Sequence, residues 1–142
     1  AEAERLTEVF GLATFDAVHC KNSLDHSYDP VRGIVEMLRV VRPGRPVFLR
    51  HSQNEAEKNS YAGLHQWNLE LRGGRLLAWQ PARPGAGGEA AEVDVEARLV
   101  AEGLLDPGGL EVRVVDRPYV EGEDRPVKAD WVEAVLWRSS TE

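Results

Sequence analysis

The side chains of this sequence that are best suited to chemistry follow two short apolar segments, residues 14–20 and 46–50. Histidine exchanges protons near neutral pH, and a positioned histidine or carboxylate can accept a proton from a reacting hydroxyl or amine. Asp25, His26 and His51 are therefore candidates for general-base catalysis. The polar residues that follow the two segments are Cys20, Lys21, Asn22, Asp25 and His26 after the first, and His51, Ser52, Gln53 and Asn54 after the second.

The two apolar segments have the composition of strands, and a helix is predicted between them. Residues 14–20 are typical of a buried strand, in which His19 is expected to pack in the core. Asp29 and Pro30 suit the N-cap and first position of a helix over residues 29–42, because proline has no N–H to leave unpaired there. Strand, helix and strand form a βαβ unit with parallel strands.

Parallel strands end at the same edge of a sheet, and ligands of open α/β sheets bind beyond that edge. We therefore expect Asp25, His26 and His51 to converge. His26 and His51 each have a second interpretation, a structural one, in which His26 orients the helix that follows it. The three residues could in principle bind a metal ion, but no ligand spacing supports this, and we predict no metal site.

Two further elements are predicted downstream. Asn54 and Glu57 match a capping box, in its asparagine variant, for a second helix from Asn54 to about Gly63. Residues 68–80 alternate around two glycines and predict a hairpin with a two-residue turn.

The last third of the chain is less clear in its pattern. Residues 92–105 fit either a strand or a helix capped by Asp94, and we favour the helix. Residues 110–115 and 131–137 are predicted strands, joined by a charged connection.

Composition describes one ordinary globular domain over residues 1–142. A net charge of -7 makes nucleic acid and anionic membrane surfaces poor partners. The one cysteine excludes an internal disulfide and favours the cytoplasm, and the excess of arginine over lysine favours a bacterial source.

Several segments resemble class I S-adenosylmethionine-dependent methyltransferases of the small-molecule type. FDAVHCKNSLDHSYDP at 15–30 and EMLRVVRPG at 36–44 resemble the fourth strand and the next helix of that family. NEAE at 54–57 and LHQWN at 64–68 are similar to a bacterial subgroup. The resemblance implies the carboxyl-terminal half of a Rossmann-like α/β domain, with parallel strands, an antiparallel closing strand and helices on the faces.

The resemblance also implies a role for individual residues toward S-adenosylmethionine and its acceptor. Asp25, His26 and His51 would face the methyl-transfer site. Glu2 and Ala3 would contact adenine, unless they are a frayed helix start, and Trp67 would line the substrate site, unless it belongs to the core. The remaining assignments are Cys20, Lys21 and Asn22 beside the methionine part of the cofactor, mainly through their backbone, and Asn54, His65 and Asn68 in the substrate wall.

The implied activity is methyl transfer to an oxygen or nitrogen of a small metabolite, such as a sugar or a secondary metabolite. The family's glycine-rich loop and its ribose-binding acid are absent from these residues, so we expect the 142 residues alone to bind cofactor poorly. Arg45 also replaces a glycine that is usual in the family. The alternative is a non-catalytic, methyltransferase-derived interaction domain. The expected partners are a small-molecule substrate, the remainder of the same chain, or a second copy bound through an exposed sheet edge.

Overall fold

The computed structural model describes residues 1–82, 89–116 and 130–141. Its larger sheet has four strands in the order β1-β2-β7-β6. β1 and β2 are parallel, whereas β7 is antiparallel to both of its neighbours. Three strands therefore share one direction and β7 opposes them, which confirms the predicted α/β class and the antiparallel closing strand. The bounds are Val18–Lys21 for β1, Pro46–Ser52 for β2, Leu105–Asp116 for β6 and Asp130–Arg138 for β7.

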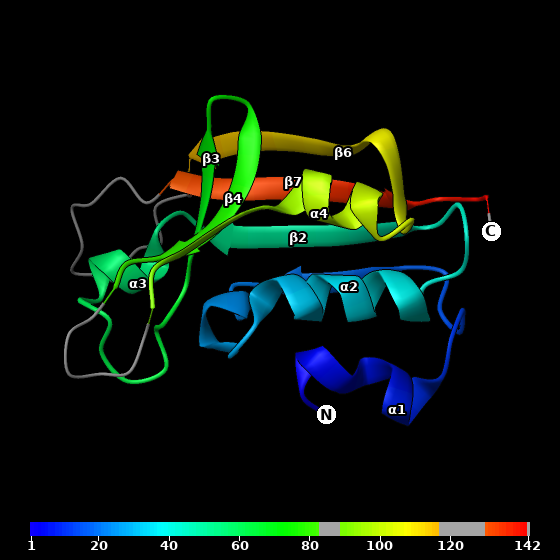
Figure 1. Ribbon diagram of the computed structural model, residues 1–142, viewed down its shortest axis with the longest axis horizontal. Helices are drawn as coiled ribbons and strands as arrows, with labels where there is room; N and C mark the ends of the chain where they lie inside the picture. Colours follow the sequence, from blue (N-terminus) through cyan, green and yellow to red (C-terminus); the bar gives the residue numbers. More distant parts are fainter. Residues whose placement is uncertain (83–88, 117–129, 142) are drawn as a thin grey trace.

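Helix α2, Pro30–Val40, lies along β2 (Figure 1) and begins as the sequence predicts. The Asp29 carboxylate accepts a hydrogen bond from the Arg32 backbone N–H at 3.0 Å, and Pro30 occupies the first turn. Ile34 and Leu38 are fully buried on the apolar face of the helix. The helix therefore anchors the segment that enters it from the end of β1.

Strand β1 is shorter and more exposed than predicted. Residues 14–17 lie outside it, with only an isolated bridge from Phe15 to Val41. His19 is exposed, so the expectation that it packs in the core is wrong. The physical reason is position, because β1 pairs only with β2 among the described strands and stands at the edge of the sheet.

The smaller sheet has the order β3-β4-β5 and contains the predicted hairpin. Gly73 and Gly74 have φ values of 58° and 77°, which a two-residue hairpin turn requires and which glycine adopts without strain. The hairpin passes the carboxyl end of β2 (Figure 1). The bounds are Asn68–Arg72 for β3, Arg75–Gln80 for β4 and Ala91–Asp94 for β5.

Helix α3, Glu55–Lys58, is a single turn, so the prediction of a helix to about Gly63 is wrong. Ser60 and Tyr61 have φ values of 53° and 57°, in the left-handed region, and this ends the helix. The predicted cap is also wrong, because Asn54 itself has a φ of 52° and its side chain does not cap the helix.

Helix α4, Val95–Ala101, confirms the favoured interpretation of residues 92–105. Asp94 caps it by accepting from the Ala97 backbone N–H at 3.1 Å. The alternating pattern just before the cap belongs to β5, so both patterns in the sequence correspond to real elements. The charged connection between β6 and β7 falls at residues 117–129, outside the described residues.

The amino-terminal segment packs on the far side of α2 from the sheet (Figure 1). It consists of the 3-10 helix η1, Ala3–Arg5, and helix α1, Leu6–Phe10. The fully buried Glu36 of α2 accepts hydrogen bonds from the backbone N–H and the hydroxyl of Thr7, at 2.8 and 2.6 Å. No helix among the described residues is long and apolar enough to span a membrane.

One hydrophobic core joins the two sheets. It combines apolar side chains of α2, α4, the β3–β4 hairpin and the inner face of the larger sheet, where Val47, Leu49 and Leu136 lie. The opposite face of the larger sheet has exposed aromatic side chains, Phe48 and Trp137.

Candidate functional site

Asp25 is a fully buried carboxylate at the centre of a histidine cluster. It belongs to the 3-10 helix η2, Leu24–His26, which follows the end of β1. Three imidazoles lie around it, those of His26, His51 and His65. The predicted convergence of Asp25, His26 and His51 is therefore found, and His65 joins them from a segment 40 residues away.

His51, near the end of β2, is enclosed by protein on both ring nitrogens. Its Nδ1 lies 2.8 Å from the Ser52 carbonyl oxygen, which can only accept, so Nδ1 carries a proton. Its Nε2 accepts from the Asp25 backbone N–H at 3.4 Å and lies 3.1 Å from Asp25 Oδ1, to which it can donate only when Nε2 is protonated as well. Only 3% of the side chain is exposed, and the geometry assigns His51 to holding Asp25 in place.

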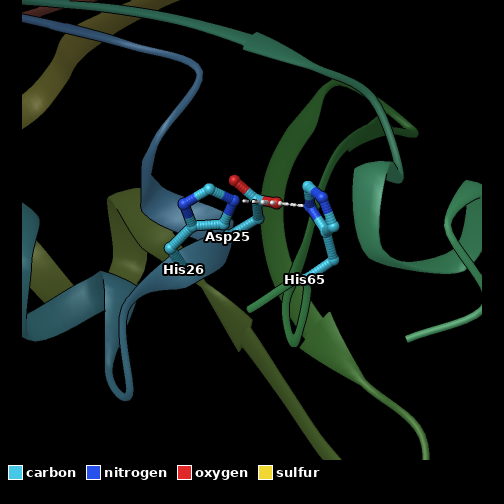
Figure 2. Close-up of side chains that lie close together, drawn as sticks. All are labelled: Asp25, His26 and His65. Carbon is cyan, nitrogen blue, oxygen red and sulfur yellow. Dashed lines mark hydrogen bonds and ion pairs between the residues drawn. The ribbon is translucent and has the colours of Figure 1, made fainter. Parts of the chain in front are cut away.

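His65 and His26 contact the other oxygen of the same carboxylate. His65 Nδ1 lies 2.6 Å from Asp25 Oδ2, and His26 Nε2 lies 3.5 Å from that oxygen. Figure 2 shows the Asp25 carboxylate between the two rings, whose centroids are 4.9 Å apart. The His65 and His26 side chains are 31% and 40% exposed, so both can meet a solute.

Backbone hydrogen bonds fix the segment that carries His65. The Asp25 carbonyl accepts from the backbone N–H groups of Gln66 and Trp67, at 3.0 and 3.3 Å. The Trp67 indole N–H donates to the Tyr28 carbonyl at 3.2 Å. The approach to β3, residues 65–67, is thereby joined to the residues that follow β1. This positions His65 against the carboxylate.

The pKa of Asp25 is set by two opposing causes. Burial raises the pKa of the carboxyl, and the hydrogen bonds from His51 and His65 lower it. The lowering prevails, so the pKa lies below the ordinary aspartate value and Asp25 is ionised at neutral pH. An ionised Asp25 accepts from His65 Nδ1–H, which leaves the lone pair of a neutral His65 ring on Nε2.

The segment at the end of β1 is held by contacts with β2 and with Ser23. Asn22 has a φ of 47°, and its side-chain oxygen accepts from the Ser52 backbone N–H at 3.1 Å. Cys20 Sγ lies 3.2 Å from the Ser23 hydroxyl; burial raises the pKa of the Cys20 thiol, and the Ser23 contact only partly opposes this. Lys21 points to the other face of the sheet, with its ammonium 5.8 Å from the Trp131 ring.

Glu2 and Ala3 lie at the start of η1, beside α2. Glu2 is exposed and precedes η1. Ala3 packs on α2, where a β-carbon added to Gly33 would lie 3.3 Å from that of Ala3. Their expected role toward adenine therefore stays a prediction.

The residues predicted for the substrate wall divide between structure and surface. Trp67 belongs to the core, as one of its two interpretations holds, and is 9% exposed. Asn68 is fully buried and accepts from the Glu57 backbone N–H at 2.9 Å. Asn54 accepts from the Trp79 indole N–H at 3.2 Å. Of this set, His65 alone lies in the cluster described above.

No protein family and no curated protein matches this sequence. Among solved structures, an S-adenosylmethionine-dependent methyltransferase from Methanosarcina mazei is similar, with a TM-score of 0.54 and 19% identity over 98% of this chain. The CurJ carbon methyltransferase is also similar, with a TM-score of 0.51 and 15% identity over 99% of this chain. This chain covers 65% and 34% of those two chains, respectively. The described residues therefore have the Rossmann-like fold of class I methyltransferases.

Proposed function

We propose that the protein transfers a methyl group from S-adenosylmethionine to an oxygen or nitrogen atom of a small metabolite. The observation that supports this most directly is the buried Asp25 carboxylate joined to His65 beyond the ends of two parallel strands. That edge is where α/β sheets bind their ligands. The fold adds support, because the neighbouring solved structures are methyltransferases.

Within this proposal, His65 is the general base and Asp25 orients it. Asp25 holds the Nδ1 proton of His65, so Nε2 can accept the proton that a hydroxyl or amine loses as it attacks the methyl carbon. His26, one of the candidate bases in the sequence, lies beside the same carboxylate oxygen at a longer distance. His51 holds Asp25 from the interior and is a positioning residue.

When bound, S-adenosylmethionine supplies an electrophilic methyl group on sulfur. We assign to the cofactor the backbone at the end of β1, at Cys20 and Lys21, and the exposed Glu2 with Ala3 at its adenine. The Asn22 side-chain oxygen accepts from Ser52 and the Asn22 N–H donates to the Arg50 carbonyl at 2.7 Å, so a backbone contact of Asn22 with the cofactor falls to its carbonyl oxygen. Imidazole and carboxylate groups suit a polar acceptor, which supports an oxygen or nitrogen atom as the methylated one.

The test is methyl transfer by the protein in its full natural length, measured with methyl-labelled S-adenosylmethionine and a panel of small alcohols, sugars and amines. His65→Ala is expected to lower the rate constant by a factor of about 10² to 10⁴, the usual contribution of a general base. His19→Ala is the control, because His19 is exposed on β1. A folded full-length protein that binds neither S-adenosylmethionine nor S-adenosylhomocysteine would favour the non-catalytic interaction domain instead.

A further inference from the structure

Beyond the proposed methyl transfer, the geometry points to a binding site for a divalent transition-metal ion formed by Asp25, His26 and His65. Each of these residues offers one ligand atom, and the three atoms lie within 4.8 Å of one another. From the sequence we predicted no metal site, although Asp25, His26 and His51 could in principle have supplied ligands. His51 is enclosed by Ser52 and Asp25, and His65 takes its place.

Two imidazoles and one carboxylate are the ligands of several open metal sites. Catalytic zinc is bound by two histidines and a glutamate in one group of enzymes, and two histidines with one carboxylate bind ferrous iron in another. Imidazole nitrogen favours zinc, cobalt, nickel and iron over magnesium and calcium, which prefer oxygen ligands. The partly exposed rings of His26 and His65 leave room for water or a solute to complete the coordination.

The distances around Asp25 are close to those that a bound ion requires. Ligands at about 2.0 to 2.1 Å from the ion lie about 3.0 to 3.4 Å from one another. The contacts of Asp25 Oδ2 with His65 Nδ1 and His26 Nε2 are 2.6 and 3.5 Å. An ion therefore needs a small opening of the first contact and a rotation of the half-exposed His26 ring toward His65. The carboxylate itself stays in place.

The surroundings of Asp25 support it as a fixed ligand. Metal-binding carboxylates are usually held by outer hydrogen bonds, which orient them and strengthen binding. His51 accepts from the Asp25 backbone N–H and lies 3.1 Å from Oδ1, so it fixes the residue and leaves Oδ2 directed at His26 and His65. The hydrogen bonds from Gln66 and Trp67 to the Asp25 carbonyl keep the His65 segment in register with it.

The ion and the proposed general base use the same ring. A metal ion on Nδ1 of His65 displaces the proton from that atom, and the neutral ring then carries its proton on Nε2 instead. Bound metal is thus expected to inhibit methyl transfer, a consequence that rests on the proposed function. Metal binding itself does not depend on it.

The experiment is a titration of the untagged chain with Co²⁺, followed by calorimetry and by the visible absorption of the bound ion. We expect one ion per chain, displaced by Zn²⁺ and not by Mg²⁺. His26→Ala and His65→Ala should each weaken Co²⁺ binding at least about tenfold, because even the loss of an outer partner costs about 10- to 100-fold. His19→Ala should bind as the unchanged chain does.

Circular dichroism checks that each variant is folded, and the exposed His26 keeps the test meaningful if His65→Ala unfolds. Equal Co²⁺ affinity in the unchanged chain and His26→Ala, or no binding at millimolar Co²⁺, overturns the proposed site. Binding of Co²⁺ by a full-length protein that has no methyltransferase activity supports the metal site and contradicts only the proposed function.

Discussion

His51 and His65 bind the two oxygens of one carboxylate, yet their surroundings give them different roles. Both ring nitrogens of His51 contact groups inside the protein, Nδ1 the Ser52 carbonyl and Nε2 Asp25. His65 is anchored on one nitrogen and its side chain remains partly exposed. A histidine that is fixed at Nδ1 and accessible elsewhere is the arrangement that general bases share, which is why we place the chemistry on His65.

The cluster could be predicted from the sequence only in part. Asp25, His26 and His51 follow from two parallel strands that end at one edge, which is a consequence of local patterns. The contact between Asp25 and His65 depends on backbone hydrogen bonds between η2 and the approach to β3. Such a contact across a long loop has no signature in the spacing of residues.

Glu36 gives a prediction on pH and stability at the scale of one residue. Burial raises the pKa of its carboxyl, but hydrogen bonds from Thr7 and Arg39 and the charge of Arg32 prevail and lower the pKa below the ordinary 4.5. The contribution of Glu36 to folding is therefore complete above about pH 4.5 and is lost as the pH falls through its folded-state pKa. Glu36→Gln should lower the free energy of unfolding by about 2 kcal/mol at pH 7.

The measurement is urea denaturation of both proteins at pH 7 and in steps down to pH 3. The difference between them should shrink as the pH falls below 4.5. Glu102→Gln is a matched control, because Glu102, the exposed residue just after α4, forms the same i,i+4 pair with Arg98. It should cost about 0.5 kcal/mol or less. A constant difference between Glu36→Gln and the unchanged protein at every pH contradicts the prediction.

At the scale of elements, the short helix α3 depends on a residue beyond its own end. Asn68 of β3 accepts from the Glu57 backbone N–H and donates to the Tyr61 hydroxyl at 3.0 Å. Asn68→Ala removes both contacts inside the protein, and we expect a loss of about 1 to 2 kcal/mol in the free energy of unfolding. Thermal and urea denaturation measure it.

The comparison variant is Asn54→Gly, at the position where the sequence predicts the cap. It removes the hydrogen bond from Trp79 and also relieves a left-handed backbone, so the two effects should nearly cancel. If Asn54→Gly costs as much as Asn68→Ala, the cap assignment to Asn68 is wrong.

The elements that could be predicted are those specified by neighbouring residues. The start of α2 depends on Asp29 and Pro30, and the hairpin turn depends on two adjacent glycines. The predictions that were wrong concern features that depend on residues distant in the sequence. α3 takes its cap from Asn68, and the exposure of His19 reflects the place of β1 at the edge of the sheet. Local pattern carries no information about either.

At the scale of the whole molecule, a single core predicts a single unfolding transition. Leu99 of α4 is fully buried in the cluster that also contains Leu69 of the hairpin and Leu136 of β7. A cavity at Leu99 should therefore weaken both sheets together. Leu99→Ala is expected to lower the free energy of unfolding by about 2 to 5 kcal/mol.

Urea denaturation followed by far-ultraviolet circular dichroism and by tryptophan fluorescence tests this prediction, because coincident curves indicate one cooperative unit. Leu64→Ala, at a side chain that is 66% exposed, is the control and should leave the midpoint nearly unchanged. Two transitions in Leu99→Ala, with only one of them shifted, would mean that the hairpin and α4 fold separately from the larger sheet. In that case the link between η2 and the approach to β3 would join two independent units, and the contact of His65 with Asp25 would depend on how those units dock.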